Sequence, residues 1–153
     1  HTGWHLNIVG DGSDRKRLEA LAEELGITDS VTFCGYTTDP AAYYSEASIM
    51  ALTSEYEGWP CMLLEGMGAG VVPVAMDCCE GVHEMLSDGR GILTPAGDTD
   101  AFARGLSRIM GDPGLRERMR PALKEFASRF TPSAVASKWL SLINDLTAES
   151  YDK

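Results

Sequence analysis

The sequence of 153 residues lacks several features that mark large classes of proteins. No apolar run approaches the roughly 20 residues of a membrane-spanning helix, and the first residues do not resemble a signal peptide. Four cysteines are present, but no two form a C-x-x-C pair, and Cys78-Cys79 is not a zinc-ligand spacing. We therefore expect reduced thiols in a cytoplasmic protein.

Positive charge is also scarce. Thirteen Lys and Arg stand against 23 Asp and Glu, which gives a formal net charge of −10. Such a surface repels nucleic acid, so we expect no nucleic-acid partner. A small anionic ligand is still compatible with this charge, because the N-terminus of a helix holds phosphate without a net basic surface.

What the sequence does contain is an alternation of short apolar runs with segments of helical periodicity. The runs are apolar throughout, which is typical of a parallel sheet covered by helices on both faces. The pattern therefore predicts an α/β fold with a Rossmann-like, doubly wound parallel sheet, and we interpret Trp4 and Trp139 as core aromatics. The predicted strands are 4–9, 31–34, 48–52, 71–76 and 91–94, and the predicted helices are 14–25, 41–47, 60–69, 82–86, 99–110, 113–130 and 133–146.

In such a sheet, ligands bind outside the carboxyl ends of the strands. The search for a site therefore narrows to the loops after Val9, Cys34, Leu52 and Met76. The loop after Val9 contains Gly10-Asp11-Gly12, but position 15 is Arg where a dinucleotide fingerprint has its third glycine. We interpret this loop as a turn near a nucleotide and not as an NAD site.

The loop after the third strand carries the most informative residues. Glu57 and Glu65 stand eight positions apart, the first in the loop and the second in the following helix. Gly58 allows a ligand close to the backbone, and Pro60 suits the first position of that helix. The free amides of the next two residues, Cys61 and Met62, would then face a diphosphate at the positive helix end. A carboxylate one turn further can accept hydrogen bonds from both hydroxyls of a ribose.

Taken as a whole, Ser54–Gly70 resembles the signature of retaining glycosyltransferases with the GT-B fold, in particular family 4. That signature has a serine after a strand, Glu-Gly-aromatic, a second Glu, and a closing glycine. The similarity extends from about Trp4 to Phe130. Other segments that fit it are Leu6–Gly12, Val31–Gly35, Val71–Ala75 and Asp88–Leu93.

The resemblance implies a role for particular residues. Glu57 would be the catalytic residue that faces the transferred sugar, and Glu65 would bind the ribose of the donor. Ser54 would brace the loop. The remaining donor-binding residues would be Gly58, Trp59, Cys61 and Met62 near the diphosphate and sugar, Tyr36 and Thr37 at the base, and Gly10 and Gly12 in the first turn.

The implied activity is transfer of a sugar, with retention, from a UDP- or GDP-sugar to a glycan or cell-envelope acceptor. Residues 1–153 would be the donor-binding domain, with C-terminal helices at 113–147. We expect no metal and no cofactor, because GT-B enzymes of this kind need none. The full-length protein would be cytoplasmic, with peripheral contact at the cytoplasmic membrane face as a further expectation.

Two parts of the family pattern are absent from these residues. One is the N-terminal acceptor-binding domain, and the other is a first strand followed by an Arg and a Lys that neutralise the leaving diphosphate. We therefore expect the chain alone to be inactive. Without its central first strand, the sheet would have a gap, repack or borrow a strand.

Two other functions stay open at this point. A nucleotide-sugar 2-epimerase shares the fold, and a non-catalytic nucleotide-sugar-binding module could have kept it. The pair Glu57 and Glu65 argues for the transferase over both alternatives. His83 is interpreted as a local packing residue, and Glu84 as a residue that steadies the loop before it.

Overall fold

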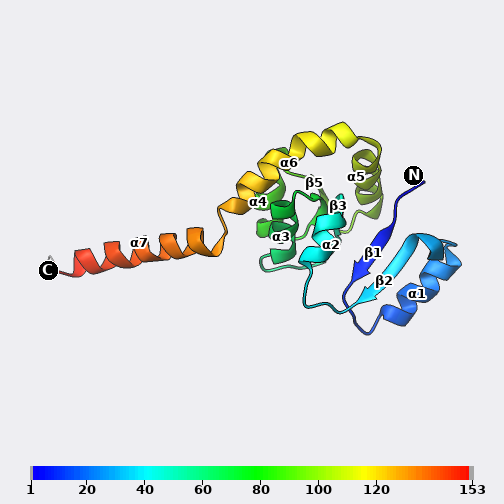
Figure 1. Cartoon of the computed structure of the whole chain (residues 1–153), viewed down its shortest axis with the longest axis horizontal. Coiled ribbons are helices and arrows are strands. Elements are labelled where there is room, and N and C mark those ends of the chain that lie inside the picture. Colours follow the sequence, from blue (N-terminus) through cyan, green and yellow to red (C-terminus); the bar gives the residue numbers. More distant parts are fainter. Residues whose placement is uncertain (1, 152–153) are drawn as a thin grey trace. The chain divides into compact units, whose positions relative to one another are not determined.

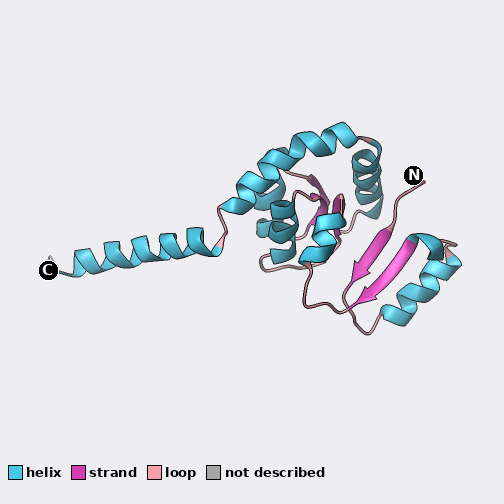
Figure 2. Cartoon of the chain, in the orientation of Figure 1, coloured by secondary structure: helices cyan, strands magenta, loops and turns pink. Residues whose placement is uncertain are grey.

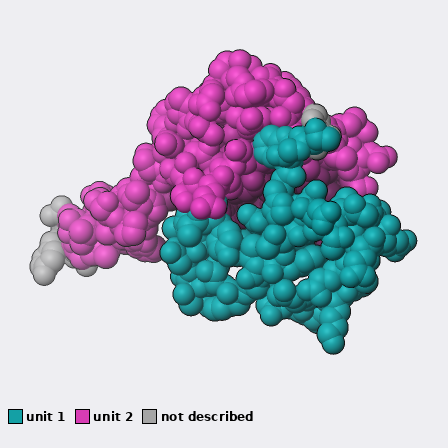
Figure 3. All heavy atoms as spheres, turned by 45° about the vertical axis from the view of Figure 1, so that its right-hand side comes forward, with its two compact units in different colours: residues 1–43 teal, residues 44–153 magenta. Residues whose placement is uncertain are grey.

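The computed structural model describes residues 2–151 and divides the chain into two compact units (Figure 3). Unit 1 comprises residues 1–43 and unit 2 comprises residues 44–153. Helices and strands alternate along most of the chain, and within the described residues only helices follow the last strand, as Figure 1 shows.

Unit 1 is a small β-α-β arrangement with two parallel strands. Strand β1 (Leu6–Val9) leads into helix α1 (Arg15–Glu24), and a short 3-10 turn, η1 (Thr28–Ser30), leads into β2 (Val31–Gly35). The strands pair with Leu6 opposite Val31. The predicted strands and helix are therefore confirmed, with boundaries that differ by one or two residues.

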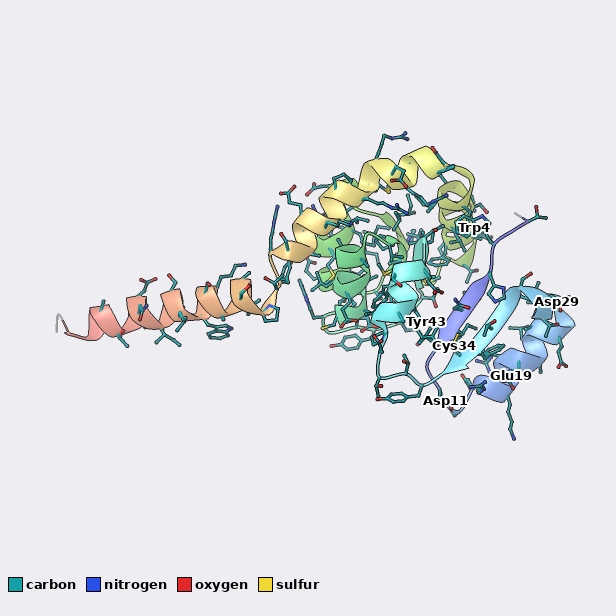
Figure 4. All side chains as sticks on the ribbon, viewed as in Figure 1. Trp4, Asp11, Glu19, Asp29, Cys34 and Tyr43 are labelled. Carbon is teal, nitrogen blue, oxygen red and sulfur yellow. The ribbon has the colours of Figure 1, made fainter. Side chains whose placement is uncertain are left out.

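Arg15 holds α1 against the strand that follows it. Its guanidinium donates to Glu19 Oε1 at 2.8 Å and to the carbonyl of Phe33 at 3.2 Å, and Figure 4 labels Glu19 on α1. The apolar interior of this unit is small, because Ala22 is the one hydrophobic residue of its described part that is fully buried.

Unit 2 contains a three-stranded parallel sheet in the order β3-β4-β5 (Figure 2). Its strands are β3 (Ile49–Leu52), β4 (Val72–Asp77) and β5 (Ile92–Pro95). The helix α2 (Ala41–Glu46) spans the boundary between the units. The other helical segments are α3 (Cys61–Ala69), α4 (Glu80–Leu86), η2 (Ser87–Gly89), α5 (Thr99–Gly111), α6 (Pro113–Ser128) and α7 (Pro132–Tyr151).

The core of unit 2 forms around the central strand β4, which is buried from Val72 to Met76. A strand that is apolar on both faces needs cover on both, and helices supply it. The fully buried residues Leu63 of α3, Ile109 of α5 and Leu123 of α6 pack into this core. Each such side chain contributes about 1.5–3 kcal/mol by leaving water.

The structure shows how the strands are divided between sheets, and it corrects one expectation about the core. Among the described residues no strand ladder joins β1 and β2 to β3, β4 and β5, so the chain has two parallel sheets instead of one continuous sheet. Trp139 is not a core aromatic, since 61% of it is exposed on α7.

None of the helices described within residues 2–151 combines the length and the apolar character that crossing a membrane requires.

Candidate functional site

The loop between β3 and α3 carries the first candidate carboxylate. The hydroxyl of Ser54 donates to Glu57 Oε1 at 2.8 Å, and both side chains are half-buried. The hydrogen bond fixes the carboxylate at the carboxyl end of the sheet. The prediction that Ser54 braces the loop therefore has a specific contact behind it.

The start of α3 differs in detail from the prediction. Pro60 is the N-cap and not the first helical residue, with φ −75° and ψ 83°. The amide of Cys61 donates to the carbonyl of Trp59 at 2.8 Å, and the amide of Leu63 donates to the carbonyl of Pro60 at 2.9 Å. The Cys61 amide is thus occupied, which corrects the expectation that it is free for a diphosphate. Met62 is then the better candidate donor in this first helical turn.

Trp59 anchors the loop on neighbouring elements. Its ring lies 5.6 Å from the ring of Phe130, centroid to centroid. A Cβ atom at Gly81 would lie only 2.9 Å from Trp59 Cε3, so the missing side chain at position 81 lets the indole lie against the start of α4. At Gly58, in contrast, a Cβ atom would meet nothing within 4 Å, so the space above this backbone is open.

Glu65 lies in the second turn of α3 and has a partner that the sequence did not indicate. The hydroxyl of Tyr44 donates to Glu65 Oε2 at 3.2 Å. Burial, then the charge of Glu65 and this hydrogen bond, raise the pKa of Tyr44 to about 12. The two positions are 21 apart in the sequence, so local spacing does not reveal this pair.

The carboxyl end of β4 contributes further polar groups. Asp77 Oδ2 and His83 Nδ1 are 2.9 Å apart. This hydrogen bond and the Asp77 charge raise the pKa of His83 above its ordinary value. The prediction that His83 is a packing residue is wrong, since 54% of its side chain is exposed.

The pKa of the Cys78 thiol, next to Asp77, is affected by the loop that carries Glu57. Burial raises the pKa of the Cys78 thiol, and neighbouring Cys79 and the charge of Glu57 raise it further. The end of β4 therefore lies within electrostatic reach of the Glu57 carboxylate.

Four predicted site residues lie in unit 1. Gly10 has φ +133°, a backbone conformation that favours glycine, and its amide donates to the carbonyl of Gly35 at 2.8 Å. This bond joins the ends of β1 and β2.

The other predicted residues of unit 1 have local contacts or are exposed. Gly12 follows Gly10 in the same turn, where its amide donates to Asp11 Oδ1. Tyr36 is 80% exposed, and the Thr37 hydroxyl accepts from the amide of Asp39.

One acidic spacing stands at the start of α5. Asp98-Thr99-Asp100 has the Asp-x-Asp spacing of a metal motif. Asp98 has a structural role here. Its Oδ1 accepts a hydrogen bond from the amide of Ala101 at 2.8 Å and so caps the N-terminus of α5. The spacing is here that of a helix start.

The parallel α/β fold and the double-glutamate segment around the start of α3 define a class of protein, the glycosyltransferases of GT-B fold. A family model described as glycosyl transferases group 1 matches residues 1–126. The chain belongs to this family.

Individual relatives agree with the assignment. The chain is 34% identical to an exopolysaccharide phosphotransferase of Streptomyces coelicolor, over 99% of this chain and 16% of that protein. The solved apo structure of a lipopolysaccharide outer core galactosyltransferase matches 93% of this chain with 28% identity and a TM-score of 0.78, over 41% of its own length. The chain spans less than half of each of these relatives.

The same fold recurs at lower identity. The structure of an Anabaena protein, HepE, in complex with UDP matches 95% of this chain with a TM-score of 0.86 and 22% identity, over 42% of its own length. The β1-β2 unit and the β3-β4-β5 unit are thus both parts of the C-terminal domain of a GT-B fold.

Proposed function

We propose that this chain binds the nucleoside-diphosphate-sugar donor of a retaining glycosyltransferase, and that the whole protein transfers the sugar to a glycan or cell-envelope acceptor. The family supports sugar transfer. The donor, the stereochemistry and the acceptor are the parts that this proposal adds.

The observation that carries the proposal is the arrangement around the start of α3. Glu57 is fixed before the helix by Ser54, and Glu65 is fixed within it by Tyr44. Between them lie the open backbone of Gly58 and the first turn of α3. An anion is favoured at a helix N-terminus, because the first amides have no acceptor within the helix and the helix dipole is positive there.

Each group then has a distinct task. The Met62 amide and the Gly58 backbone hold the diphosphate, and Glu65 accepts hydrogen bonds from the ribose hydroxyls, each of which contributes about 1.5–3 kcal/mol. Glu57 faces the sugar, where a negative carboxylate stabilises the positive charge that develops at the anomeric carbon as the phosphate leaves. Trp59 keeps this loop in place through Phe130 and the start of α4.

The family resemblance adds proposed nucleotide contacts by residues of unit 1. Tyr36 and Thr37 contact the base through their backbone, and the turn from Gly10 to Gly12 lies near the nucleotide. UDP is one of the two candidate nucleotides, and a neighbour of the same fold holds it. At 22% identity the likeness shows a shared fold only. Binding measurements with UDP and GDP decide between the two nucleotides.

The acceptor class is inferred from the relatives. The first is an exopolysaccharide phosphotransferase by name, and the second acts on the lipopolysaccharide outer core. An acceptor of the cell envelope agrees with both. We further propose that the reaction needs no metal, and that the protein works on the cytoplasmic side of the membrane.

A transfer assay on the intact protein tests this function. Glu57→Gln removes the charge but keeps the shape, and we expect turnover of a UDP- or GDP-sugar to fall by about 100-fold or more, since one electrostatic group of this kind contributes that much. Glu55→Gln is the matched control, because Glu55 is an exposed acid of the same loop. Equal activity of both variants would reject the role of Glu57. An inverted anomeric configuration of the product, measured by NMR, would reject retention.

A further inference from the structure

Tyr44, a residue of unit 2, contacts the candidate site without having been assigned to it. It lies on α2, and its hydroxyl donates to Glu65 Oε2 at 3.2 Å. Its ring is half-buried against the core of the unit. A half-buried tyrosine usually finds a hydrogen-bond partner for its hydroxyl, and here that partner is the carboxylate of a predicted site residue.

The packing beside Glu65 explains why the two groups meet. Gly66 follows Glu65 on α3, and a Cβ atom there would overlap the end of Met50 and lie 3.6 Å from Tyr44 Cδ1. The missing side chain therefore lets Met50 approach α3 closely, and the ring of Tyr44 packs beside the same position at an ordinary contact distance. With its ring held in this way, the hydroxyl of Tyr44 reaches the preceding residue, Glu65.

The hydrogen bond between Tyr44 and Glu65 leaves other acceptor positions of the carboxylate for a ligand. A carboxylate has two oxygens and about four acceptor positions, of which the Tyr44 hydroxyl uses one on Oε2. Glu65 is exposed, so Oε1 and the remaining positions face solvent. The raised pKa of Tyr44, about 12, keeps the phenol protonated and therefore a donor across the whole physiological range. The contact restricts the carboxylate before any ligand arrives.

We propose that Tyr44 is a positioning residue that orients the Glu65 carboxylate toward the ribose hydroxyls of the donor, and so makes the site prefer ribose over 2′-deoxyribose. This inference rests on the proposed function, in which Glu65 binds the ribose. The preference arises because an oriented carboxylate binds two hydroxyls without first losing its own rotational freedom, whereas a single hydroxyl profits less from that orientation.

The test is calorimetric titration of the intact protein with UDP, GDP and their 2′-deoxy analogues. Tyr44→Phe removes one oxygen and keeps the ring that fills the core. We expect ribonucleotide affinity to fall by about 3- to 10-fold, the effect of one side chain that must be ordered on binding. The 2′-deoxy analogue should change by less than about 2-fold, since it gains little from the orientation. Tyr43→Phe, the same change at the next position of α2, should alter neither affinity.

Two further results separate the inference from the function on which it rests. Glu65→Gln should weaken ribonucleotide binding more than Tyr44→Phe does. If Glu65→Gln weakens binding and Tyr44→Phe leaves the preference for ribose unchanged, the role of Tyr44 is rejected and the proposed function survives. If Glu65→Gln changes nothing, or if the wild type binds neither nucleotide, both are rejected. An equal loss of affinity for ribo- and deoxyribonucleotide in Tyr44→Phe would make the residue structural and overturn the inference.

Discussion

The two units of the chain differ sharply in how much apolar surface they bury. In unit 2, most residues of β4 and several of α3, α5 and α6 are completely buried around one core. In unit 1, Leu6, Leu21 and Leu25 are 49%, 43% and 60% exposed. The same kind of parallel β-α-β unit is therefore well packed in one place and thinly packed in the other. Strand pairing alone does not make a stable unit, because hydrophobic burial supplies most of the stabilising free energy.

The predicted site residues differ between the two units in the same way. The carboxylates Glu57 and Glu65 lie on the well-packed unit and are fixed by side-chain hydrogen bonds. Tyr36 lies on the thinly packed unit and is 80% exposed. The structure thus shows side-chain hydrogen bonds that hold both carboxylates within unit 2, whereas no such contact among the described residues holds the Tyr36 side chain.

The largest expected effect is a loss of stability when the core of unit 2 is disrupted. Leu63→Ala empties a completely buried position of α3, and we expect it to lower the free energy of unfolding by about 2–5 kcal/mol. Leu21→Ala on α1 is the matched control, and its 43% exposure predicts a loss below about 1 kcal/mol. Denaturant unfolding of both variants measures the difference. Equal losses would contradict the distinction between the two units.

A smaller effect is expected from glycines at close contacts. At Gly91 a Cβ atom would lie 2.8 Å from the carbonyl oxygen of Pro73, which belongs to the backbone of β4 and cannot move aside easily. Gly91→Ala should therefore cost about 1–3 kcal/mol of unfolding free energy. At Gly12 a Cβ atom would meet nothing within 4 Å, so Gly12→Ala should be close to neutral. Thermal unfolding compares the two, and a Gly12 variant as unstable as the Gly91 variant would show that the turn after β1 is packed more tightly than described.

The smallest expected effect concerns pH. The pKa of His83 is raised by its hydrogen bond to Asp77 and by the Asp77 charge, with a lesser contribution from Glu80. A histidine whose folded pKa is raised stabilises the fold fully below its unfolded pKa, and this stabilisation is lost as the pH rises through the folded value. Asp77→Asn should therefore lower the pKa of His83 and flatten this part of the stability profile. NMR titration of the His83 ring measures the shift, and an unchanged pKa in the variant would show that Asp77 is not its cause.

The sequence predicted every strand and α-helix of the described residues, because strands apolar on both faces and helical periodicity are local signals. The position of Glu57 and Glu65 around one loop also followed from a contiguous motif. The roles of Tyr44 and Asp77 did not, because each depends on a partner that only the folded chain brings near. The exposure of Trp139 was missed for a related reason, since an aromatic in a helical pattern does not show what covers it.

The division of the strands between two sheets was left open by the sequence. The family resemblance implied that a central strand is missing, and it left a gap, repacking or a borrowed strand as outcomes. The described strands form two separate parallel sheets, β1-β2 and β3-β4-β5. Sequence could not choose among these outcomes, because strand pairing is set by long-range contacts.

The central claim is that a nucleoside diphosphate binds at the start of α3, between Glu57 and Glu65. A crystal structure of the intact protein with UDP or GDP tests it most directly. The account predicts the diphosphate within hydrogen-bonding distance of the Met62 amide, with the ribose hydroxyls on the Glu65 carboxylate. A nucleotide bound at another place, with the first turn of α3 left to water, would contradict it.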